Sequence, residues 1–120
     1  MEVLVEKDGK VFLVHRVDEH WNGWHIPGGY IPCNAQSIDD AYNRVVKREL
    51  GYKVHLKKIL EVYKWKPGEH RYGFPTSIVC VCEPLGEIKE TETARFFEHV
   101  PDGFLADCHR QFVDKYFQEK

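Results

Sequence analysis

The stretch WHIPGGYIPCNAQSIDDAYNRVVKRELGY, residues 24–52, decides the fold of this chain. Its Pro-Gly-Gly segment stops any regular element. A helix is predicted from about Ser37 to Leu50, because Ser37 is a good N-cap and Asp39 and Asp40 favour the first turn. Gly51 supplies the residue that ends the helix. The stretch is therefore typical of a loop that leads into one well-capped helix.

One charged residue breaks the pattern of this helix. At about 100° per residue its apolar side chains share one face, which comprises Ile38, Ala41, Tyr42, Val45 and Val46. Glu49 falls near the middle of that face, about 40° from Val45, and lies in the last turn, where the helix dipole disfavours an anion. A core-facing carboxylate is costly unless it is paired, hydrogen-bonded or bound to a metal. Two interpretations stay open: a helix-end glutamate that reaches water or pairs with Arg44 or Arg48, or a metal ligand.

Strand patterns flank this stretch on both sides. Met1 to Glu6 and Val11 to Arg16 are predicted as a hairpin, since the Asp-Gly pair between them supplies the turn. Further strands are expected at Trp21–Ile26, Lys53–Trp65, Thr76–Cys82 and Ala94–His99. A second helix is predicted from about Asp102 to Gln118, where apolar residues recur at three- and four-residue spacing. These elements predict an α/β fold in which two main helices flank a mixed central sheet.

Length and composition restrict the class of protein. With 120 residues and no linker or repeat, the chain is predicted to form one domain over residues 1–120. A net charge of −2 argues against an extended nucleic-acid-binding surface. The apolar runs are too short to span a bilayer and the N-terminus lacks a secretory pattern, so a cytoplasmic location without membrane association is expected. The four cysteines form no CxxC pair and carry no functional signal.

The stretch from Trp24 to Tyr52 resembles the Nudix box, which reads W-x-(L/V/I)-P-G-G, a short loop, and a helix carrying R-E-U-x-E-E-x-G-U. The matching residues are Trp24, Pro27, Gly28, Gly29, Ala41, Arg44, Glu49 and Gly51. The flanking strands and the closing helix suit the same family, so the resemblance covers nearly the whole chain. It implies a Nudix-type α/β/α sandwich and a hydrolase that uses Mg²⁺ or Mn²⁺ on a nucleoside-diphosphate-linked substrate.

The departures from the box are as informative as the matches. The family's helix usually carries three glutamates, but Val45 and Arg48 occupy two of those places and only Glu49 remains. The ending from Arg44 to Gly51 is similar to that of the GDP-mannose mannosyl hydrolase branch, which also keeps only the last helix carboxylate. This similarity implies one magnesium ion and cleavage of the sugar C–O bond in a nucleotide sugar such as GDP-mannose. One carboxylate, one carbonyl and substrate phosphates can together hold such an ion.

The resemblance also assigns candidate metal ligands. Glu49 is the expected side-chain ligand, and Gly29 or its neighbour Gly28 would offer a backbone carbonyl. Glu90 falls where the mannosyl hydrolase branch places a further side-chain ligand, and Glu92 is the alternative carboxylate. A solvated acidic turn is the competing interpretation for both of these glutamates.

Three further positions are compared with catalytic residues of the family. Arg44 resembles the box arginine, which orients the metal-binding glutamate. Thr91 stands where the mannosyl hydrolase branch has its catalytic histidine, and a threonine cannot act as a general base near neutral pH. His70, in a loop expected to border the pocket, is the best replacement base or phosphate contact.

Substrate contacts are expected at the end of the second strand and around the double glycine. Arg16 stands where the mannosyl hydrolase branch has an arginine that contacts the diphosphate, and a guanidinium fork suits two phosphate oxygens. Trp21, Tyr30 and Trp65 are candidates for stacking on a nucleobase, with core packing as the competing role. His15, His55, His99 and His109 are assigned to surface or packing positions.

Three functions stay open from the sequence. The first is a magnesium-dependent Nudix hydrolase acting on a nucleotide sugar, at the sugar carbon or at the phosphoanhydride. The second is a general nucleoside-diphosphate pyrophosphatase that recruits Glu90 or Glu92 in place of the lost helix carboxylates. The third is a Nudix-fold module that binds a nucleotide or a protein without turnover. The expected ligand is a small nucleoside diphosphate derivative, and the sequence leaves open whether the chain forms a homodimer.

Overall fold

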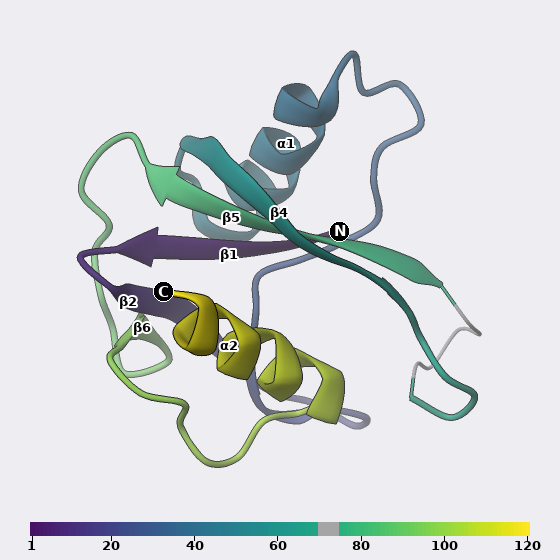
Figure 1. Cartoon of the computed structure of the whole chain (residues 1–120), viewed down its shortest axis with the longest axis vertical. Helices are drawn as coiled ribbons and strands as arrows, with labels where there is room; N and C mark the ends of the chain where they lie inside the picture. The colour runs from purple at the N-terminus through teal and green to yellow at the C-terminus, as the bar shows by residue number, and fades with distance from the viewer. Residues whose placement is uncertain (70–74) are drawn as a thin grey trace.

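A six-stranded sheet and two helices make up the fold of this computed structural model (Figure 1). The structure describes residues 1–69 and 75–120. The strands are β1 (Glu2–Lys7), β2 (Lys10–Val17), β3 (Asn22–His25), β4 (Val54–Lys64), β5 (Thr76–Pro84) and β6 (Ala94–Phe97). The helices are α1 (Ile38–Leu50) and α2 (Asp107–Glu119). Every predicted strand and helix is present, with differences at the ends.

The sheet mixes parallel and antiparallel pairs. Along its path the strands follow the order β3-β2-β1-β5-β4, and β6 pairs with β2 off this path. β1 and β5 run parallel, whereas the other described pairs are antiparallel. In Figure 1, α1 lies against one face of the sheet and α2 against the other. The predicted α/β fold with two helices flanking a mixed sheet is confirmed.

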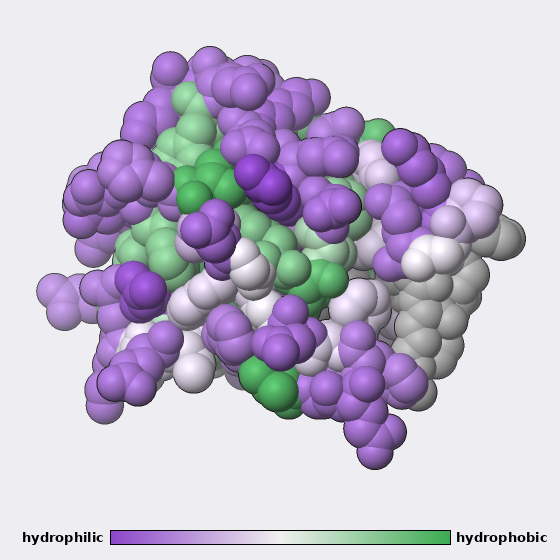
Figure 2. All heavy atoms as spheres, turned by 90° about the horizontal axis from the view of Figure 1, so that it is seen from below, coloured by the Kyte–Doolittle hydropathy of each residue, from purple (hydrophilic) through white to green (hydrophobic). Residues whose placement is uncertain are grey.

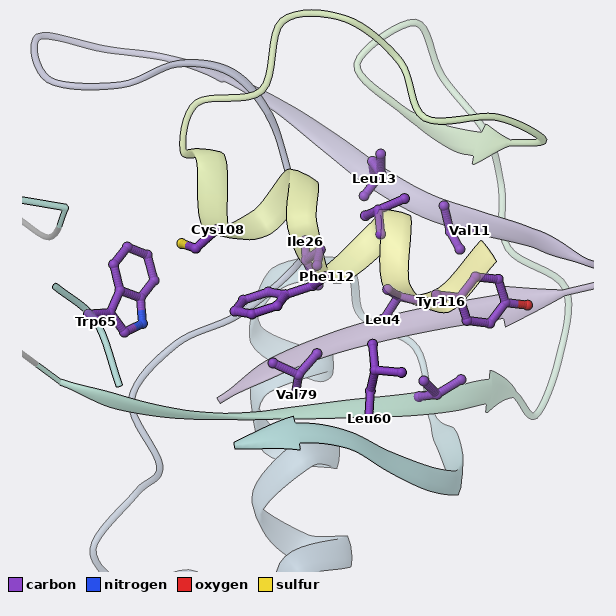
Figure 3. Packing of buried hydrophobic residues seen from close by; sticks show 12 residues of the cluster. Leu4, Val11, Leu13, Ile26, Leu60, Trp65, Val79, Cys108, Phe112 and Tyr116 are labelled. Carbon is purple, nitrogen blue, oxygen red and sulfur yellow. The ribbon is translucent and has the colours of Figure 1, made fainter. Parts of the chain in front are cut away.

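Each face of the sheet carries its own apolar core. Val3 and Val5 belong to the core under α1 and Leu4 to the core under α2, because successive side chains of a strand point to opposite faces. Figure 3 shows the core under α2, with Trp65 at one end of the cluster. By the same alternation Glu2, at the start of β1, faces α2. A carboxylate is thus placed in line with a run of buried apolar side chains.

The ends of α1 are those that the sequence predicts. The Ser37 hydroxyl accepts a hydrogen bond from the Asp40 amide at 3.0 Å. At the other end Gly51 has a φ of 76°, and its N–H donates to the carbonyls of Val46 and Lys47. A left-handed backbone conformation at this position favours glycine. The local capping signals therefore fix the length of the helix.

Glu49 does not face the core, so that part of the prediction is wrong. The buried side chains of α1 are Ala41, Tyr42, Val45 and Val46, whereas Glu49 is exposed. A helical wheel treats the apolar face as covered along its whole length. In the structure the last turn of α1 borders an open pocket, and Glu49 lines it. The carboxylate therefore reaches solvent without the cost of burying a charge.

The second helix begins at Asp107, later than the predicted start at about Asp102. The segment before it is held against β3, where the Trp24 amide donates to the Gly103 carbonyl at 2.8 Å and the Leu105 amide to the Trp24 carbonyl at 3.0 Å. Gly103 has a φ of 79°, which an α-helix does not use. Pairing with a distant strand therefore overrides the apolar periodicity from which the start was predicted.

The face of the molecule in Figure 2 carries hydrophilic side chains with small hydrophobic areas between them. Val17 and Tyr30 are among the exposed large apolar residues of the molecule, and both border the pocket described below. Part of the exposed apolar surface therefore belongs to a pocket. Within residues 1–69 and 75–120, no helix has the length and apolar character needed to cross a membrane.

Candidate functional site

A pocket of about 730 Å³ opens at the edge of the sheet where β1 and β5 begin. Its walls come from the first residues of β1 and β5, the last residues of β2 and β3, the last turn of α1 and the first turn of α2. Because β1 and β5 are parallel, their first residues meet at the same edge of the sheet. The volume is in the range of sites that hold small organic ligands. Segments far apart in the sequence therefore converge on one site.

The turn Gly28–Gly29 and Glu49 at the end of α1 form one side of this pocket, and Arg48 packs against Gly29. These four residues are here called the rim. A side chain at Gly28 would meet the backbone oxygen of Met1 at 2.8 Å. A side chain at Gly29 would meet Nη2 of Arg48 at 1.9 Å. Neither of these two glycines has a positive φ. They are required because the N-terminal strand and a guanidinium approach the turn closely.

The oxygen atoms at the rim that could act as metal ligands decide which cation the site can hold. Gly29 and Glu49 both line the pocket. The Gly29 carbonyl accepts the Met1 ammonium at 2.9 Å, and the Gly29 amide donates to the Met1 carbonyl at 3.0 Å. The described residues contain no group of three or more His, Cys, Asp or Glu that could hold a metal ion. One carboxylate and one carbonyl fit a single hard cation completed by phosphate oxygens and water, and do not fit a cluster of cations.

The two acidic residues predicted as further ligands lie elsewhere. Neither Glu90 nor Glu92 belongs to the described lining of the pocket. Glu90 Oε1 accepts the Phe96 amide at 2.8 Å, which holds the segment before β6 in place. The side chain of Glu92 is exposed. Their placement favours the alternative interpretation of a solvated turn, with Glu90 tying that turn to the sheet.

Arg44 forms hydrogen bonds around the start of α1 rather than with Glu49, the candidate metal ligand. Its Nε donates to Asp40 Oδ1 at 3.0 Å and its Nη1 to Asn34 Oδ1 at 2.8 Å. The Gln36 amide and the Arg44 guanidinium keep the pKa of the Asp40 carboxyl below its ordinary value. The expected contact with Glu49 is not among these, because residues five apart are about 140° apart around a helix. Arg44 therefore acts here on the helix start.

The predicted substrate contacts Arg16, Trp21 and Tyr30 all line the pocket. Arg16 Nε donates to Asp18 Oδ2 at 2.7 Å, and Asp18 Oδ1 accepts the amides of His20 and Trp21 at 2.8 Å. These bonds fix the turn between β2 and β3 and hold the guanidinium beside the pocket. Tyr30 is 64% exposed, so its ring borders the opening. The structure brings these three side chains to the same site.

The predicted replacement base, His70, lies outside the described residues. Another histidine, His25, does line the pocket. Burial lowers the pKa of His25 to about 4, against the opposing effect of its hydrogen bond with the Ile26 carbonyl. The ring is therefore neutral near pH 7 and does not provide a positive charge for phosphate binding.

A second set of polar side chains, here called the floor, lies buried at the pocket: Glu2, Trp65, Ser77 and His109, each 4–7% exposed. Trp65 Nε1 donates to Ser77 Oγ at 2.7 Å. The Ile26 amide donates to His109 Nδ1 at 3.0 Å, which assigns the ring proton to Nε2. That Nε2 lies 3.8 Å from Glu2 Oε1. The floor is therefore a connected polar network inside an apolar core.

Glu2 is ionised in spite of its burial. Burial raises the pKa of its carboxyl, but His109, the Met1 ammonium and a hydrogen bond from Ser77 together lower it below the ordinary value. Among the described residues, the buried Oε2 has no hydrogen-bond partner. A buried charged oxygen without a donor is costly, and such an atom requires a functional or structural explanation.

Two floor residues, Glu2 and Ser77, were not predicted as site residues from the sequence, whereas Trp65 was a candidate for base stacking or core packing. The assignment of His109 to the surface or to packing was incomplete, because the ring is 6% exposed and hydrogen-bonded. Two signals were available. Glu2 alternates in phase with Leu4 on an otherwise apolar strand, and His109 precedes Phe112 by three residues on the buried side of α2. A charged or polar residue at a core position of either element marks these sites.

Comparison with known proteins shows the family of this chain. The NUDIX domain family matches residues 2–115 of the 120-residue chain. This chain belongs to the Nudix hydrolase family. An ADP-ribose pyrophosphatase of Methanocaldococcus jannaschii is a relative with 30% identity over 122 residues, covering 98% of this chain and 71% of that protein. The predicted family and enzyme class are confirmed, and the relative named here is not a GDP-mannose hydrolase.

Solved structures show the same Nudix fold at lower identity. A UDP-X diphosphatase has 20% identity and a TM-score of 0.75, and this chain covers 59% of its length with 98% of its own. An ADP-ribose pyrophosphatase from Streptococcus suis has 21% identity and a TM-score of 0.68, with coverage of 98% of this chain and 87% of that one. The Nudix domain of Shewanella oneidensis NrtR in complex with ADP ribose has 17% identity and a TM-score of 0.70, with coverage of 98% and 83%. These likenesses establish the fold.

Proposed function

We propose that this Nudix hydrolase cleaves the diphosphate of a nucleoside-diphosphate-linked compound, with ADP-ribose as the first candidate. The proposal rests on one observation: the same pocket contains the metal-ligand oxygens of the rim and, deeper inside, aromatic and polar side chains. The relative at 30% identity is named an ADP-ribose pyrophosphatase. A solved structure of the same fold contains ADP ribose. Both names support the choice of the first substrate to test.

At the rim, Glu49 would hold a divalent cation such as Mg²⁺ or Mn²⁺, and the Gly29 carbonyl, one lone pair of which accepts the Met1 ammonium, would offer its second lone pair. When bound, that cation supplies neutralisation of the charge on the diphosphate. Arg48 adds a positive charge beside the turn, since its guanidinium packs against Gly29. Arg16 adds a second guanidinium from the end of β2. In the family, further helix carboxylates bind additional cations, which neutralise the diphosphate. This chain lacks those carboxylates, and the two arginines therefore supply part of that positive charge.

The aromatic side chains of the pocket are suited to the nucleoside. Trp21 is half-buried and Tyr30 borders the opening, and both line the pocket. Aromatic rings at such positions stack on the face of a base while the base edge stays available for hydrogen bonds. The nucleoside is thus expected inside the pocket and the diphosphate at the rim.

The proposed reaction is hydrolysis of the phosphoanhydride. A water oxygen bonds to one phosphorus, the bridging P–O bond breaks, and the bridging oxygen stays with the other phosphate. ADP-ribose and water then yield AMP and ribose 5-phosphate, with release of the proton from water. Glu49 contributes by holding the cation, and the arginines contribute by orienting phosphate oxygens.

A second candidate is hydrolysis at the sugar carbon of GDP-mannose. The observation that favours it is the single carboxylate at the rim, because departure of a neutralised diphosphate from carbon requires mainly charge stabilisation. The products differ from those of the first candidate, since this reaction releases free mannose and GDP. Product analysis therefore separates the two.

The test incubates the purified protein with ADP-ribose or GDP-mannose in ¹⁸O-labelled water, with Mg²⁺ or Mn²⁺. We expect AMP and ribose 5-phosphate, with ¹⁸O in one phosphate group by ³¹P NMR and mass spectrometry. Free mannose carrying ¹⁸O, together with GDP, would replace the first candidate by the second. Nucleotide binding without any product would overturn both and leave a binding module.

A further inference from the structure

The floor contains a feature that hydrolysis at the rim does not use. Glu2 lines the pocket, is 7% exposed and lies on the face of β1 that α2 covers. Its carboxylate is far less accessible than that of Glu49, which is exposed at the rim. A buried carboxylate in the wall of a ligand pocket is a specific hydrogen-bond acceptor.

The donors around this carboxylate serve one of its oxygens only in part. His109 Nε2 lies 3.8 Å from Oε1, beyond an ordinary hydrogen bond. The buried Oε2 has no partner among the described residues. The carboxylate therefore keeps acceptor capacity that a ligand donor can satisfy.

The other polar groups of the floor are already matched to one another. His109 Nδ1 is occupied as an acceptor by the Ile26 amide at 3.0 Å. Ser77 Oγ accepts from Trp65 Nε1 at 2.7 Å. His109 and Ser77 are thus fixed by Ile26 and Trp65, and the Glu2 carboxylate beside them keeps one oxygen without a partner among the described residues.

We propose that the Glu2 carboxylate selects the nucleobase by accepting a hydrogen bond from an exocyclic amino group. The pocket is lined by the aromatic side chains of Trp21 and Trp65, which suit a planar ligand, and Glu2 lies in the same wall. The proposed contact requires the buried Oε2 of Glu2 to turn towards the base when the nucleotide binds. Adenine and cytosine present such an amino group. Hypoxanthine and uracil carry a carbonyl oxygen at the same position, and two acceptors facing each other in a buried site repel.

This inference rests on the proposed function, because it requires a nucleotide in the pocket. The first measurement uses the unchanged protein and two ligand pairs, ADP against IDP and CDP against UDP, with Mg²⁺ present. Isothermal titration calorimetry is expected to show roughly 10- to 100-fold tighter binding of the amino-bearing member of each pair, the value of a hydrogen bond to a charged group. No variant is needed for this comparison.

The second measurement repeats the titrations with Glu2→Gln. The amide keeps the shape of the side chain but adds a donor that can pair with a carbonyl oxygen, so the preference for ADP over IDP is expected to fall to about threefold or less. Glu6→Gln is the matched control, because Glu6 lies on the same face of the same strand and pairs with Lys57 instead. It should keep the preference of the unchanged protein.

The outcomes separate the two proposals. Equal binding of ADP and IDP by the unchanged protein, together with hydrolysis of ADP-ribose, overturns the role of Glu2 and leaves the proposed function intact. An unaltered preference in folded Glu2→Gln also overturns it. If no nucleotide binds and none is hydrolysed, both proposals fail.

Discussion

The floor and the rim of the pocket are built in different ways. The floor takes Glu2 from β1, Ser77 from β5 and His109 from α2, all buried inside or at the ends of regular elements. The rim consists of a turn that has no room for side chains and the last turn of α1, where Glu49 is exposed. Side chains on strands and helices are held more firmly than those on turns and helix ends.

This difference separates two chemical tasks. Discrimination between similar bases requires a donor or acceptor that is already in position. A cation and a diphosphate instead complete each other's coordination as they bind, so their site can stay open beforehand. Changes at the rim are therefore expected to affect turnover more than stability, and the following experiments test that expectation.

The largest effect is expected for Glu49→Gln. Removal of the one carboxylate of the rim should reduce kcat for ADP-ribose by about 100-fold or more. The melting temperature should stay unchanged or rise slightly, because the side chain is exposed. Steady-state kinetics, calorimetric melting and Mn²⁺ binding by EPR measure these effects. Glu87→Gln is the matched control, since Glu87 is exposed and outside the pocket lining. A large loss of stability in Glu49→Gln would show instead that Glu49 belongs to a structural ion pair.

The two glycines of the rim allow a sharper comparison within one turn. Gly28→Ala should lower the free energy of unfolding by about 1–3 kcal/mol, because the new methyl group meets a backbone oxygen at 2.8 Å and the backbone must shift. Gly29→Ala should cost less, because it meets the end of the flexible Arg48 side chain, which can swing aside. Urea unfolding curves of both variants check the order. Equal losses would contradict the interpretation that Arg48 is mobile at the rim.

The protonation of His25 offers a test by pH. Burial lowers its folded pKa to about 4 from 6.5, so the unfolded chain binds the proton more readily than the folded chain. The stability that the neutral ring contributes is present above about pH 6.5 and is lost as pH falls through about 4, with a loss of up to about 3 kcal/mol.

His25→Gln should reduce the slope of stability against pH over that range, as measured by urea unfolding at several pH values. His55→Gln, at an exposed position of β4, is the control and should keep the slope. A parallel pH dependence of the unchanged protein and His25→Gln would show that other groups cause it.

The smallest perturbation is thiol labelling, which compares loop and core without any mutation. Cys33 is exposed in the loop after the double glycine, whereas Cys108 is buried beside His109. Burial raises the pKa of Cys108 to about 12, and the other two thiols are also buried. A thiol reagent at pH 8 should label Cys33 within minutes and the remaining cysteines only after unfolding, as mass spectrometry can show. Rapid labelling of Cys108 in the folded protein would mean that the floor opens readily.

Much of the fold could be predicted because the sequence signals for its helix ends and first hairpin are local. Ser37 and Gly51 fixed the ends of α1 through their own capping bonds, and the Asp-Gly pair placed the first hairpin. The start of α2 could not be predicted in this way, because the segment before Asp107 follows Trp24 of a distant strand. The helical wheel placed Glu49 on the apolar face, and only the alternative of a helix-end glutamate that reaches water matches its exposure, since a wheel does not show that the last turn of α1 borders an open pocket.

The sequence by itself predicted the family, the two helices, and the Gly-Gly turn and Glu49 of the rim, because the turn and the helix that follows form one continuous stretch whose spacing carries its geometry. Only the tertiary structure decided the floor. Ile26 and His109 are 83 residues apart, and Glu2 meets His109 only because a strand from one end of the chain packs under the helix at the other. Such contacts depend on strand order and side-chain alternation together, and neither of these can be read from neighbouring residues.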